Sequence, residues 1–507
     1  MTFALEFRGI VKRFGSLVAN ENIDLAINPG EIHAIVGENG AGKTTLMNIL
    51  YGLIQPDSGE IFVEGRRVEF KSPADSIRAG LGMVHQQFML FNSLTVAENV
   101  IFGSEPARRG LIDRKTAYRQ IRDLSEQYGL DVDPAARVGN LPVGTRQKVE
   151  IIKTLYRKAA ILILDEPTAV LTPQERDGLF MILRSLTAQG KTVLFITHKL
   201  NEVMEISAHA TVLRNGRVTA NLRTADTTPE EITRYMVGRD VMLKVDKPPF
   251  QRGSEALKVV NLVVKDEAGH TLIKEISFAV QCGEIVGIAG VAGNGQSELV
   301  EAIVGLRPLD GGRIFLNGTD ISQQPLADRR KEISYIPEDR TNVGAAVNAQ
   351  VSENFVMGYQ SQPPISRHQF LQDAGIQQFV GGLVGRFGIK VGQLSAAMSN
   401  LSGGNMQKAI VARELTHGYP LLVADQPTRG VDVGSIEFIY QQLIDYRAQG
   451  KAILLVSADL NEIMSLSDRI LVMYEGQIAG EVEAATAQEG TLGLMMTGAW
   501  KGGKDGA

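Results

Sequence analysis

Short apolar runs followed by polar residues set the pattern of this chain. Residues 31–36, 161–164 and 193–196 are strand-like, and the last two runs are continuously apolar. Such runs are typical of parallel strands buried on both faces of a sheet, with functional residues after their carboxyl ends. Residues from about 95 to 157 instead have helical patterning with few strand signals. The pattern therefore predicts an α/β fold with a helical subdomain.

The same order of segments occurs twice along the chain. Three segments of the second half repeat three of the first, 290–297 with 37–44, 401–408 with 141–148, and 421–428 with 161–168. The spacing also agrees, because 24 positions separate Leu141 from Asp165 and Leu401 from Asp425. The repeat predicts two copies of one α/β domain.

The repeat also sets the expected domain boundaries. We expect a first domain over 1–243, a linker over 244–255, a second domain over 256–500 and a tail over 501–507. The linker has the proline and polar content of a connecting segment, and the short polar tail is expected to be disordered. A chain of 507 residues is also too long for one hydrophobic core.

Composition places the chain among ordinary soluble globular proteins. Apolar residues make up 44% and charged residues 21%, and the net charge of −5 argues against a dedicated nucleic-acid binder. No apolar run approaches the roughly 18 residues of a membrane span, and the N-terminus lacks a signal-peptide pattern. Cys282 is the single cysteine, which excludes internal disulfides and a cysteine metal cluster, and we expect it to be inert. The cytosol is the expected compartment.

A phosphate-binding pattern lies between the strand at 31–36 and a helix-like segment at 45–50. It fits G-x-x-x-x-G-K-[ST] at every fixed position. Glycines let the backbone curl around phosphate oxygens, and the helix N-terminus directs its N–H groups toward them. Lys43 is expected to neutralise the β- and γ-phosphates, and the Thr44 hydroxyl to hold Mg²⁺. The predicted nucleotide-binding residues are Gly37, Glu38, Asn39, Gly40, Ala41, Gly42, Lys43, Thr44 and Thr45.

A second motif connects both halves to a known family. Residues 401–408 read Leu-Ser-Gly-Gly and then, after two positions, Gln-Lys, before an apolar run that ends in aspartate. This signature resembles that of ABC-type ATPases, and the resemblance covers the chain apart from linker and tail. It implies two tandem P-loop ABC ATPase domains, each with a mainly parallel sheet core, an N-terminal antiparallel β part and a helical subdomain. It also implies head-to-tail pairing, with ATP between the phosphate loop of one domain and the signature of the other.

By this resemblance, the first phosphate loop belongs to a complete ATP site. Asp165 is expected to bind Mg²⁺ through water, and Glu166 to orient or deprotonate the attacking water. Gln86 is expected to sense the γ-phosphate and Mg²⁺, and His198 to contact the γ-phosphate. Phe14 is expected to stack on adenine, although a role as an ordinary core aromatic stays open. The second domain would contribute Ser402, Gly403 and Gly404.

The second phosphate loop lacks most of the groups that hydrolysis needs. Gln296 stands where the loop needs lysine, Gln426 where the catalytic glutamate belongs, and Ala458 where the histidine belongs. Glu338 replaces the loop glutamine, unless it is a solvated loop acid. In the facing signature, from the first domain, proline and valine replace Ser-Gly. We expect negligible hydrolysis here and leave nucleotide binding open, for a degenerate site of Gly290, Gly295, Gln296, Ser297, Glu338, Asp425, Gln426 and Ala458.

Two ATPase domains on one chain, with Pro-Glu-Asp-Arg at 337–340, resemble importer subunits that energise uptake of simple sugars and nucleosides. The second phosphate loop and residues 153–157 favour the nucleoside branch, with a purine-type solute; a monosaccharide like ribose, galactose or xylose is the alternative. The expected partners are integral-membrane permease subunits, of one or two kinds, and indirectly a periplasmic or lipid-anchored solute-binding protein. Nucleic acid is not expected as a partner. The chain would lie at the cytoplasmic face of the cell membrane as a peripheral subunit.

Two other classes of protein compete with this interpretation. Soluble tandem ATPases that act on the ribosome carry a long charged linker and two intact sites, whereas this linker has about a dozen residues. A regulatory module without turnover would not need Glu166 and His198.

Residues 87–91 form an apolar stretch after a polar loop, which predicts either a groove for a permease helix or ordinary core packing.

Overall fold

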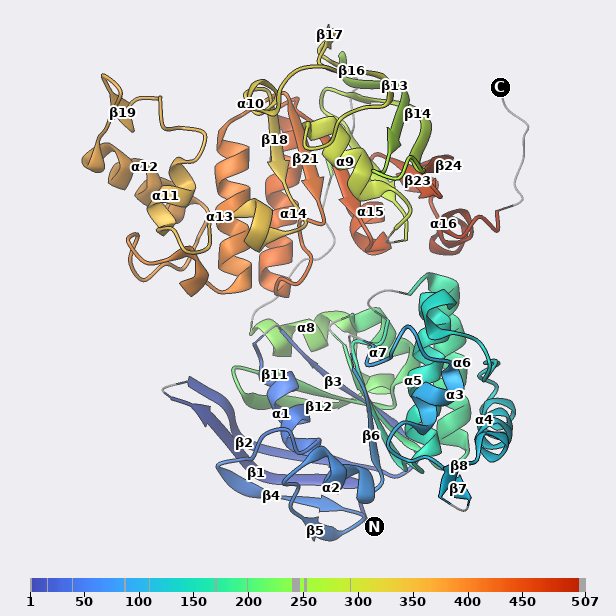
Figure 1. The fold of residues 1–507 in the computed structure, drawn as a ribbon. Helices are drawn as coiled ribbons and strands as arrows, with labels where there is room; N and C mark the ends of the chain where they lie inside the picture. Colours follow the sequence, from blue (N-terminus) through green and yellow to red (C-terminus); the bar gives the residue numbers. More distant parts are fainter. Residues whose placement is uncertain are drawn as a thin grey trace. The chain divides into compact units, whose positions relative to one another are not determined.

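The computed structural model describes residues 2–15, 17–38, 40–85, 88–108, 110–168, 171–197, 199–238, 247–249, 253–291 and 293–500. Three predicted site residues, Asn39, Gln86 and His198, lie outside these ranges. The chain divides into two compact units, Met1–Val241 and Met242–Ala507, which are taken one at a time below (Figure 1).

A six-stranded sheet forms the centre of the first unit, in the order β12-β11-β3-β10-β9-β6. The strands from β11 to β6 are parallel, and β12 runs antiparallel to β11. β3 and β10 are buried over their whole length, as expected for parallel strands covered on both faces. The bounds are β3 Ile32–Gly37, β6 Leu81–Val84, β9 Ile161–Asp165, β10 Thr192–Ile196, β11 His209–Arg214 and β12 Arg217–Arg223.

A second, antiparallel sheet covers one side of this unit, in the order β2-β1-β4-β5. Helix α1 (Lys43–Leu50) lies in the apolar core between the two sheets, where Phe7 of β1, Leu46 of α1 and Ile35 of β3 are all buried. Burial of such side chains is the main favourable term for this layer, at roughly 1.5–3 kcal/mol each. The bounds are β1 Leu5–Phe14, β2 Leu17–Ile27, β4 Ser58–Val63 and β5 Arg66–Val68.

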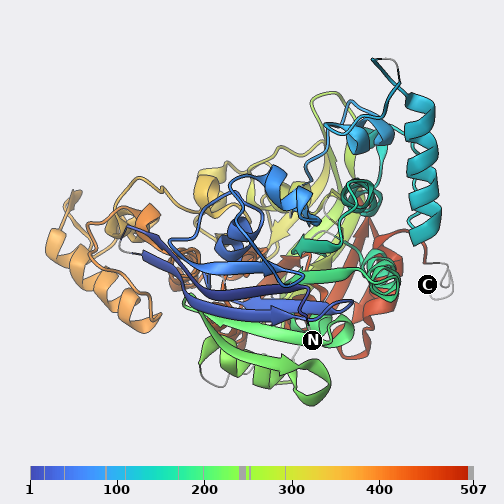
Figure 2. The ribbon, with the colours of Figure 1, turned by 90° about the horizontal axis from the view of Figure 1, so that it is seen from below.

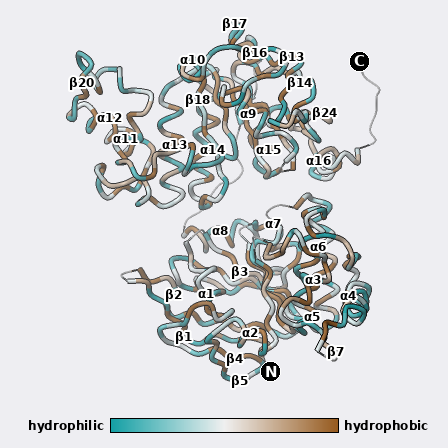
Figure 3. Tube along the Cα trace, viewed as in Figure 1, coloured by the Kyte–Doolittle hydropathy of each residue, from teal (hydrophilic) through white to brown (hydrophobic). Residues whose placement is uncertain are grey.

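Helices cover the other face of the central sheet. Apolar residues of α3, α5 and α6 pack against β9 and β10, whereas α4 lies along the outer margin of the unit (Figure 2). α4 is hydrophilic over most of its length, because few of its side chains face the core (Figure 3). The helices are α2 Pro73–Arg78, α3 Val96–Ile101, α4 Arg114–Tyr128, α5 Val143–Tyr156, α6 Pro173–Ala188, α7 Leu200–Ile206 and α8 Pro229–Val237, and a small hairpin pairs β7 Ala107–Arg108 with β8 Leu111–Ile112.

The second unit repeats this architecture strand by strand. Its central sheet has the order β24-β23-β15-β22-β21-β18, and its antiparallel sheet the order β14-β13-β16-β17. The central strands are β15 Ile285–Ala289, β18 Ile333–Ile336, β21 Leu421–Asp425, β22 Ala452–Ser457, β23 Arg469–Tyr474 and β24 Gln477–Glu483. The antiparallel strands are β13 Glu255–Lys265, β14 Thr271–Gln281, β16 Gly311–Leu316 and β17 Thr319–Asp320. The repeat predicted from the sequence is confirmed at the level of topology.

The helices of the second unit also match those of the first in order. They are α9 Gln296–Val304, α10 Leu326–Arg329, α11 Val351–Val356, α12 Asp373–Arg386, α13 Gly403–Thr416, α14 Val433–Ala448, α15 Leu460–Leu466 and α16 Glu489–Met496, with a hairpin of β19 Ser366–Arg367 and β20 Phe370–Leu371. The predicted α/β fold, with an antiparallel part and a helical subdomain in each half, is confirmed.

Two boundaries differ from those expected from the sequence. α1 begins at Lys43, two residues before the helix-like segment, because Gly42 takes the left-handed conformation that starts the helix there. β13 begins at Glu255, the last residue of the predicted linker, where it pairs with Gln281 of β14. Within the described residues, helices long and apolar enough to cross a bilayer are absent.

Candidate functional site

The phosphate loop of the first unit closes where β3 ends. Gly42 has φ 99°, and a Cβ there would overlap the Ala19 carbonyl oxygen and lie 2.6 Å from Asn20 Nδ2. The buried Asn20 side chain donates from Nδ2 to the Gly42 carbonyl at 3.1 Å. A Cβ at Gly37 would overlap the Leu213 carbonyl oxygen. Glycine is needed at both positions because the backbones of β2 and β11 approach the loop closely.

Lys43 is buried at the end of this loop. It is 7% exposed, and its Nζ donates to the carbonyl oxygens of Gly37 at 2.6 Å and Glu38 at 3.0 Å. Burial lowers the pKa of Lys43, and the negative charges of Glu166, Asp165 and Glu38 oppose that shift. Four predicted site residues, one cation and three carboxylates, are therefore brought together.

The two carboxylates after β9 influence each other. Burial raises the pKa of Asp165, the neighbouring Glu166 raises it further, and Lys43 lowers it. Glu166 has φ 46°, a left-handed conformation that is uncommon for a residue with a side chain, and its N–H donates to the Ile196 carbonyl at 2.9 Å. Thr44 is exposed at the start of α1. Carboxylate and hydroxyl oxygens at the edge of a phosphate loop form the kind of donor set that Mg²⁺ takes.

A buried carboxylate that the sequence did not indicate fixes the loops around Glu166. Glu202 is 3% exposed and accepts from the Thr168 hydroxyl at 2.7 and 2.8 Å and from the Thr197 hydroxyl at 3.2 Å. The network joins the loop after β9 to the loop after β10. A signal was available in the repeat, because Thr428 donates to the buried Glu462 at the same separation of 34 positions.

Each signature helix is also tied to the loop after the Asp-containing strand. Gln147 of α5 donates from Nε2 to the Pro167 carbonyl at 2.7 Å, and Gln407 of α13 donates to the Pro427 carbonyl at the same distance. Both glutamines are buried. The glutamine of the Gln-Lys pair therefore has a structural role in its own domain, which the sequence pattern alone did not assign.

The N-termini of the two signature helices differ. Ser402 caps α13, and its side-chain oxygen accepts from Asn405 Nδ2 at 2.8 Å and from Asn405 N at 3.4 Å. Pro142 occupies the same position before α5 and makes no side-chain cap. Gly404 is buried beside Asp432, where a Cβ would overlap the carboxylate, whereas Ser402 and Gly403 are exposed. The second unit thus presents the complete helix N-terminus and the first unit the impaired one.

The phosphate loop of the second unit has the same shape with a neutral group inside. Gly295 has φ 102°, and Gln296 is buried with its Nε2 donating to the Val291 carbonyl at 3.1 Å. A Cβ at Gly290 would overlap that amide. Ser297 is exposed at the start of α9, as Thr44 is in α1. The amide of Gln296 folds back over the loop as Lys43 does, without its charge.

The acidic positions of the second unit lie in a different electrostatic environment. Asp425 is 4% exposed, and burial together with the negative charge of Glu301 raises its pKa to about 7. Gln426 keeps the left-handed φ, at 49°, and its Oε1 accepts from the Ala458 N–H at 3.2 Å. The second unit therefore keeps the backbone turn that follows β9 in the first unit, but the charges around it differ.

Three open alternatives from the sequence can now be judged. Phe14 is 49% exposed at the end of β1, beneath the Lys12 ammonium, so it is not a core residue. Glu338 forms an ion pair with Arg429, so it is not simply a solvated acid. Phe91 is 52% exposed, which excludes core packing for its ring.

The comparison with family models decides the family. The model described as ABC transporter matches residues 20–169 and 273–429, one stretch in each half. The chain belongs to the ABC transporter family. This membership confirms the predicted tandem ABC ATPase, and with it ATP binding and an ATPase activity that is coupled to transport.

Relatives of this ABC transporter chain match over nearly its whole length. It is 44% identical to the nucleoside import ATP-binding protein NupA of Lactococcus lactis subsp. cremoris, over 96% of this chain and 97% of that protein. It is 46% identical to the guanosine import ATP-binding protein NupO of Bacillus subtilis, over 98% of both chains. It is 40% identical to the ribose import ATP-binding protein RbsA 1 of Rubrobacter xylanophilus, over 97% of this chain and 98% of that protein.

The close approach of β2 to the phosphate loop gives a first prediction. Gly40→Ala and Gly42→Ala both place a Cβ at positive φ, but Gly40 has open space around it and Gly42 does not. We expect each change to cost about 1–2 kcal/mol for the left-handed backbone, and Gly42→Ala about 1–3 kcal/mol more for the overlap. Urea unfolding without nucleotide measures the difference, and equal costs would contradict the close approach.

Proposed function

We propose that this chain is the ATP-hydrolysing subunit that energises a membrane permease for uptake of a nucleoside, of purine type. The nucleoside and guanosine import proteins are 44% and 46% identical to it over nearly the whole chain. A glucose import protein of Haloferax volcanii is 42% identical and the ribose import protein 40%. Import of a monosaccharide is therefore the alternative. The relatives' names favour import over action on the ribosome.

The unequal equipment of the two phosphate loops carries the mechanistic part of the proposal. The first loop holds the ammonium of Lys43 beside two carboxylates, and the second holds the neutral amide of Gln296. Phosphate charge is stabilised mainly by cations and N–H groups. Of the differences at the second site, glutamine in place of lysine should therefore weaken the stabilisation of phosphate most. We infer one competent ATP site and one degenerate site, built on Gln296, Asp425, Gln426 and Ala458.

Each site is proposed to be completed by the signature of the other domain. Ser402, Gly403 and Gly404 at the N-terminus of α13 would close over ATP bound at the first loop, with a hydroxyl and N–H groups toward the γ-phosphate. At α5, Pro142 offers no N–H and no hydroxyl, so the same closure over the second loop is impaired. This pairing uses the division into a first domain at 1–243 and a second at 256–500.

Hydrolysis would depend on groups of the first domain. Glu166 would orient or deprotonate the attacking water, with Gln86 and His198 near the γ-phosphate, and the exposed Phe14 would stack on adenine. Mg²⁺ would be held by the Thr44 hydroxyl, by Gln86 and, through water, by Asp165, and when bound it neutralises developing phosphate charge. The Thr168–Glu202 hydrogen bonds would keep the loop that carries Glu166 in place.

The proposed location is the cytoplasmic face of the cell membrane. The chain would bind there to integral-membrane permease subunits, of one or two kinds, and would respond indirectly to a periplasmic or lipid-anchored solute-binding protein. Met89 and Phe91 are exposed apolar residues, and the Phe91 ring lies 5.3 Å from the exposed ring of Phe102. We propose that they contribute to the permease contact.

The unequal sites give a sharp prediction. Glu166→Gln removes the proposed base but leaves the size of the side chain, so steady-state ATPase activity should fall by at least about 10²-fold while ATP remains bound. Gln426→Glu is the matched change in the second domain. Added to the Glu166→Gln variant, it should restore little ATPase activity, because Gln296 and Ala458 remain at the second site. Phosphate release and retention of labelled ATP measure both. Similar ATPase rates in wild type and Glu166→Gln would refute the asymmetry.

The permease contact is tested by Phe91→Glu. The added charge should weaken assembly with the permease by at least 10-fold, about 1.4 kcal/mol or more, without changing the affinity for nucleotide. Met181→Glu is the control, because Met181 is 65% exposed on α6 and lies outside the proposed contact. Co-purification with the permease and nucleotide binding are the measurements. Unchanged assembly of the Phe91→Glu complex would rule out the contact.

The solute is tested on the solute-binding protein encoded with the permease. We expect it to bind purine nucleosides more tightly than ribose, galactose or glucose in calorimetric titrations. Nucleoside should also stimulate ATP hydrolysis by the assembled transporter in liposomes. Stimulation by a monosaccharide alone would select the alternative solute and leave the ATPase assignment intact.

A further inference from the structure

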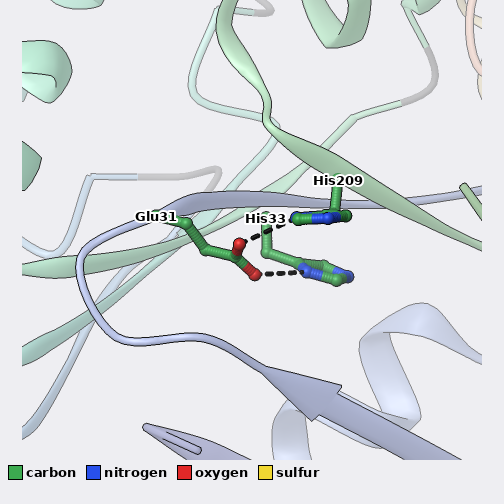
Figure 4. Close-up of side chains that lie close together, drawn as sticks. All are labelled: Glu31, His33 and His209. Carbon is green, nitrogen blue, oxygen red and sulfur yellow. Dashed lines mark hydrogen bonds and ion pairs between the residues drawn. The ribbon is translucent and has the colours of Figure 1, made fainter. Parts of the chain in front are cut away.

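Two histidines and a glutamate converge at the end of β3 that lies opposite the phosphate loop. Glu31 directly precedes β3, His33 lies within it, and His209 is the register partner of His33 on the parallel strand β11. Figure 4 shows both imidazole rings directed at the single carboxylate. We propose that Glu31, His33 and His209 form a binding site for a divalent transition metal ion of the zinc type.

The ligand atoms are already close together. The Nδ1 atom of His33 lies 3.1 Å from Glu31 Oε1, and the Nδ1 atom of His209 lies 2.8 Å from Glu31 Oε2. All three ligand atoms lie within 4.8 Å of one another. A tetrahedral zinc ion with bonds of about 2.0–2.2 Å holds its ligand atoms about 3.3 Å apart. The two measured N–O separations are shorter than this, so the side chains would have to rotate to admit one ion between the three atoms.

The hydrogen bonds on the side of the His33 ring away from Glu31 indicate the tautomer of the ring. They place the proton on Nε2 and leave Nδ1, which faces the carboxylate, without one. The Thr211 hydroxyl donates its one proton to Asn221 Oδ1 at 2.7 Å, so its oxygen is left to accept from His33 Nε2–H at 2.7 Å. In this tautomer the Nδ1 lone pair faces Glu31, an arrangement that a metal ion between the two groups would stabilise. A metal-bound histidine typically donates its other N–H to such an outer partner.

The carboxylate is oriented from its other side as well. The backbone N–H of Asn28 and its side-chain Nδ2 donate to the two Glu31 oxygens, each at 3.1 Å. These two donors hold the Glu31 carboxylate in a fixed orientation, with its oxygens facing the two imidazoles.

The second domain provides an internal comparison at the same place. Glu284 precedes β15 as Glu31 precedes β3, and Arg469 begins β23 as His209 begins β11. The Arg469 guanidinium binds Glu284 with Nε 3.0 Å from Oε1, and Val286 takes the place of His33. The second domain thus supplies its own cation to this carboxylate. In the first domain two neutral metal ligands stand in the place of that cation.

The ligand types select the class of metal. Two imidazoles and one carboxylate suit Zn²⁺, Co²⁺ or Ni²⁺, whereas Mg²⁺ and Ca²⁺ prefer oxygen ligands alone. The His33 side chain is 5% exposed and that of Glu31 11%, while that of His209 is 33% exposed and offers a path for an ion. The site would join two strands of the central sheet at the end away from ATP.

The test uses full-length protein freed of metal with a chelator. We expect one equivalent of Zn²⁺ to bind per chain by equilibrium dialysis and elemental analysis. At about 100 times its dissociation constant, Zn²⁺ should raise the melting temperature by about 3 °C or more. Bound Co²⁺ should give the visible absorption of a tetrahedral site.

The control variants are taken from the comparison of the two domains. The double change His33→Val with His209→Arg reproduces the residues of the second domain, so it should fold and lose both the bound equivalent and the thermal shift. His209→Gln alone gives a milder version if the double variant does not fold. His270→Gln removes an exposed histidine that pairs with Asp266 elsewhere, and it should keep the full response.

Two results would overturn the proposal. One is zinc binding that persists in the double variant or disappears with His270→Gln, since the ion would then lie elsewhere. The other is wild-type protein that takes up no zinc equivalent and shows no thermal shift with Zn²⁺.

Discussion

The structure of the first domain depends on keeping one ammonium group, that of Lys43, charged in a buried place. Removing a cation from water costs several kcal/mol unless partners replace the lost hydration. The carbonyl oxygens of Gly37 and Glu38 are two such partners, each worth about 1.5–3 kcal/mol to a charged donor. The carboxylates of Glu166 and Asp165 oppose the fall in the pKa of Lys43 that burial causes, without cancelling it. They lie near Lys43 because only one strand, β10, separates β9 from β3. The order of strands in the sheet therefore determines which charges meet at this site.

The second domain has the same loop backbone as the first but lacks the charge of the lysine. Gln296 fills the loop with an amide that needs no counter-charge, and Gln426 keeps the left-handed turn of Glu166 without its carboxylate. Burial and the negative charge of Glu301 raise the pKa of Asp425 to about 7, whereas Lys43 opposes the corresponding rise at Asp165. A positive φ at a residue with a side chain costs free energy, so its survival at Gln426 indicates that the turn serves the fold in both domains.

Much of this architecture can be predicted from the sequence, because its signals are local. Continuous apolar runs identify the central strands, and the glycine pattern identifies the phosphate loop, whereas the close approach of β2 and β11 to that loop is visible only in the structure. The first turn of α1 is missed, since Lys43 extends the helix from a glycine whose conformation is not visible in a pattern. The Glu338–Arg429 pair is missed for a different reason: a half-buried acid and an exposed arginine 91 positions apart carry no periodicity.

Buried polar contacts between loops are the hardest part to predict from one sequence. Thr168 and Glu202 meet only because β9 and β10 are neighbours, and the order of strands must be known before that contact can be expected. The duplication partly removes this difficulty. Thr428 and Glu462 repeat the same spacing, so a polar pair kept in both halves indicates a structural contact, whereas a pair that differs indicates specialisation.

The same comparison explains why the two ends of the central strand have diverged in opposite directions. At the carboxyl end the first domain keeps the cation, Lys43, and the second has lost it. At the amino end the second domain has the cation, Arg469, and the first has His33 and His209 instead. A carboxylate stands at the start of the central strand in both domains. The fold therefore determines the position of this carboxylate but not the group that neutralises it. In each domain a side chain at the start of the neighbouring strand contacts the carboxylate, His209 in the first and Arg469 in the second. The residues that contact this carboxylate can therefore differ between the domains while the pairing of β3 with β11 and of β15 with β23 keeps its register.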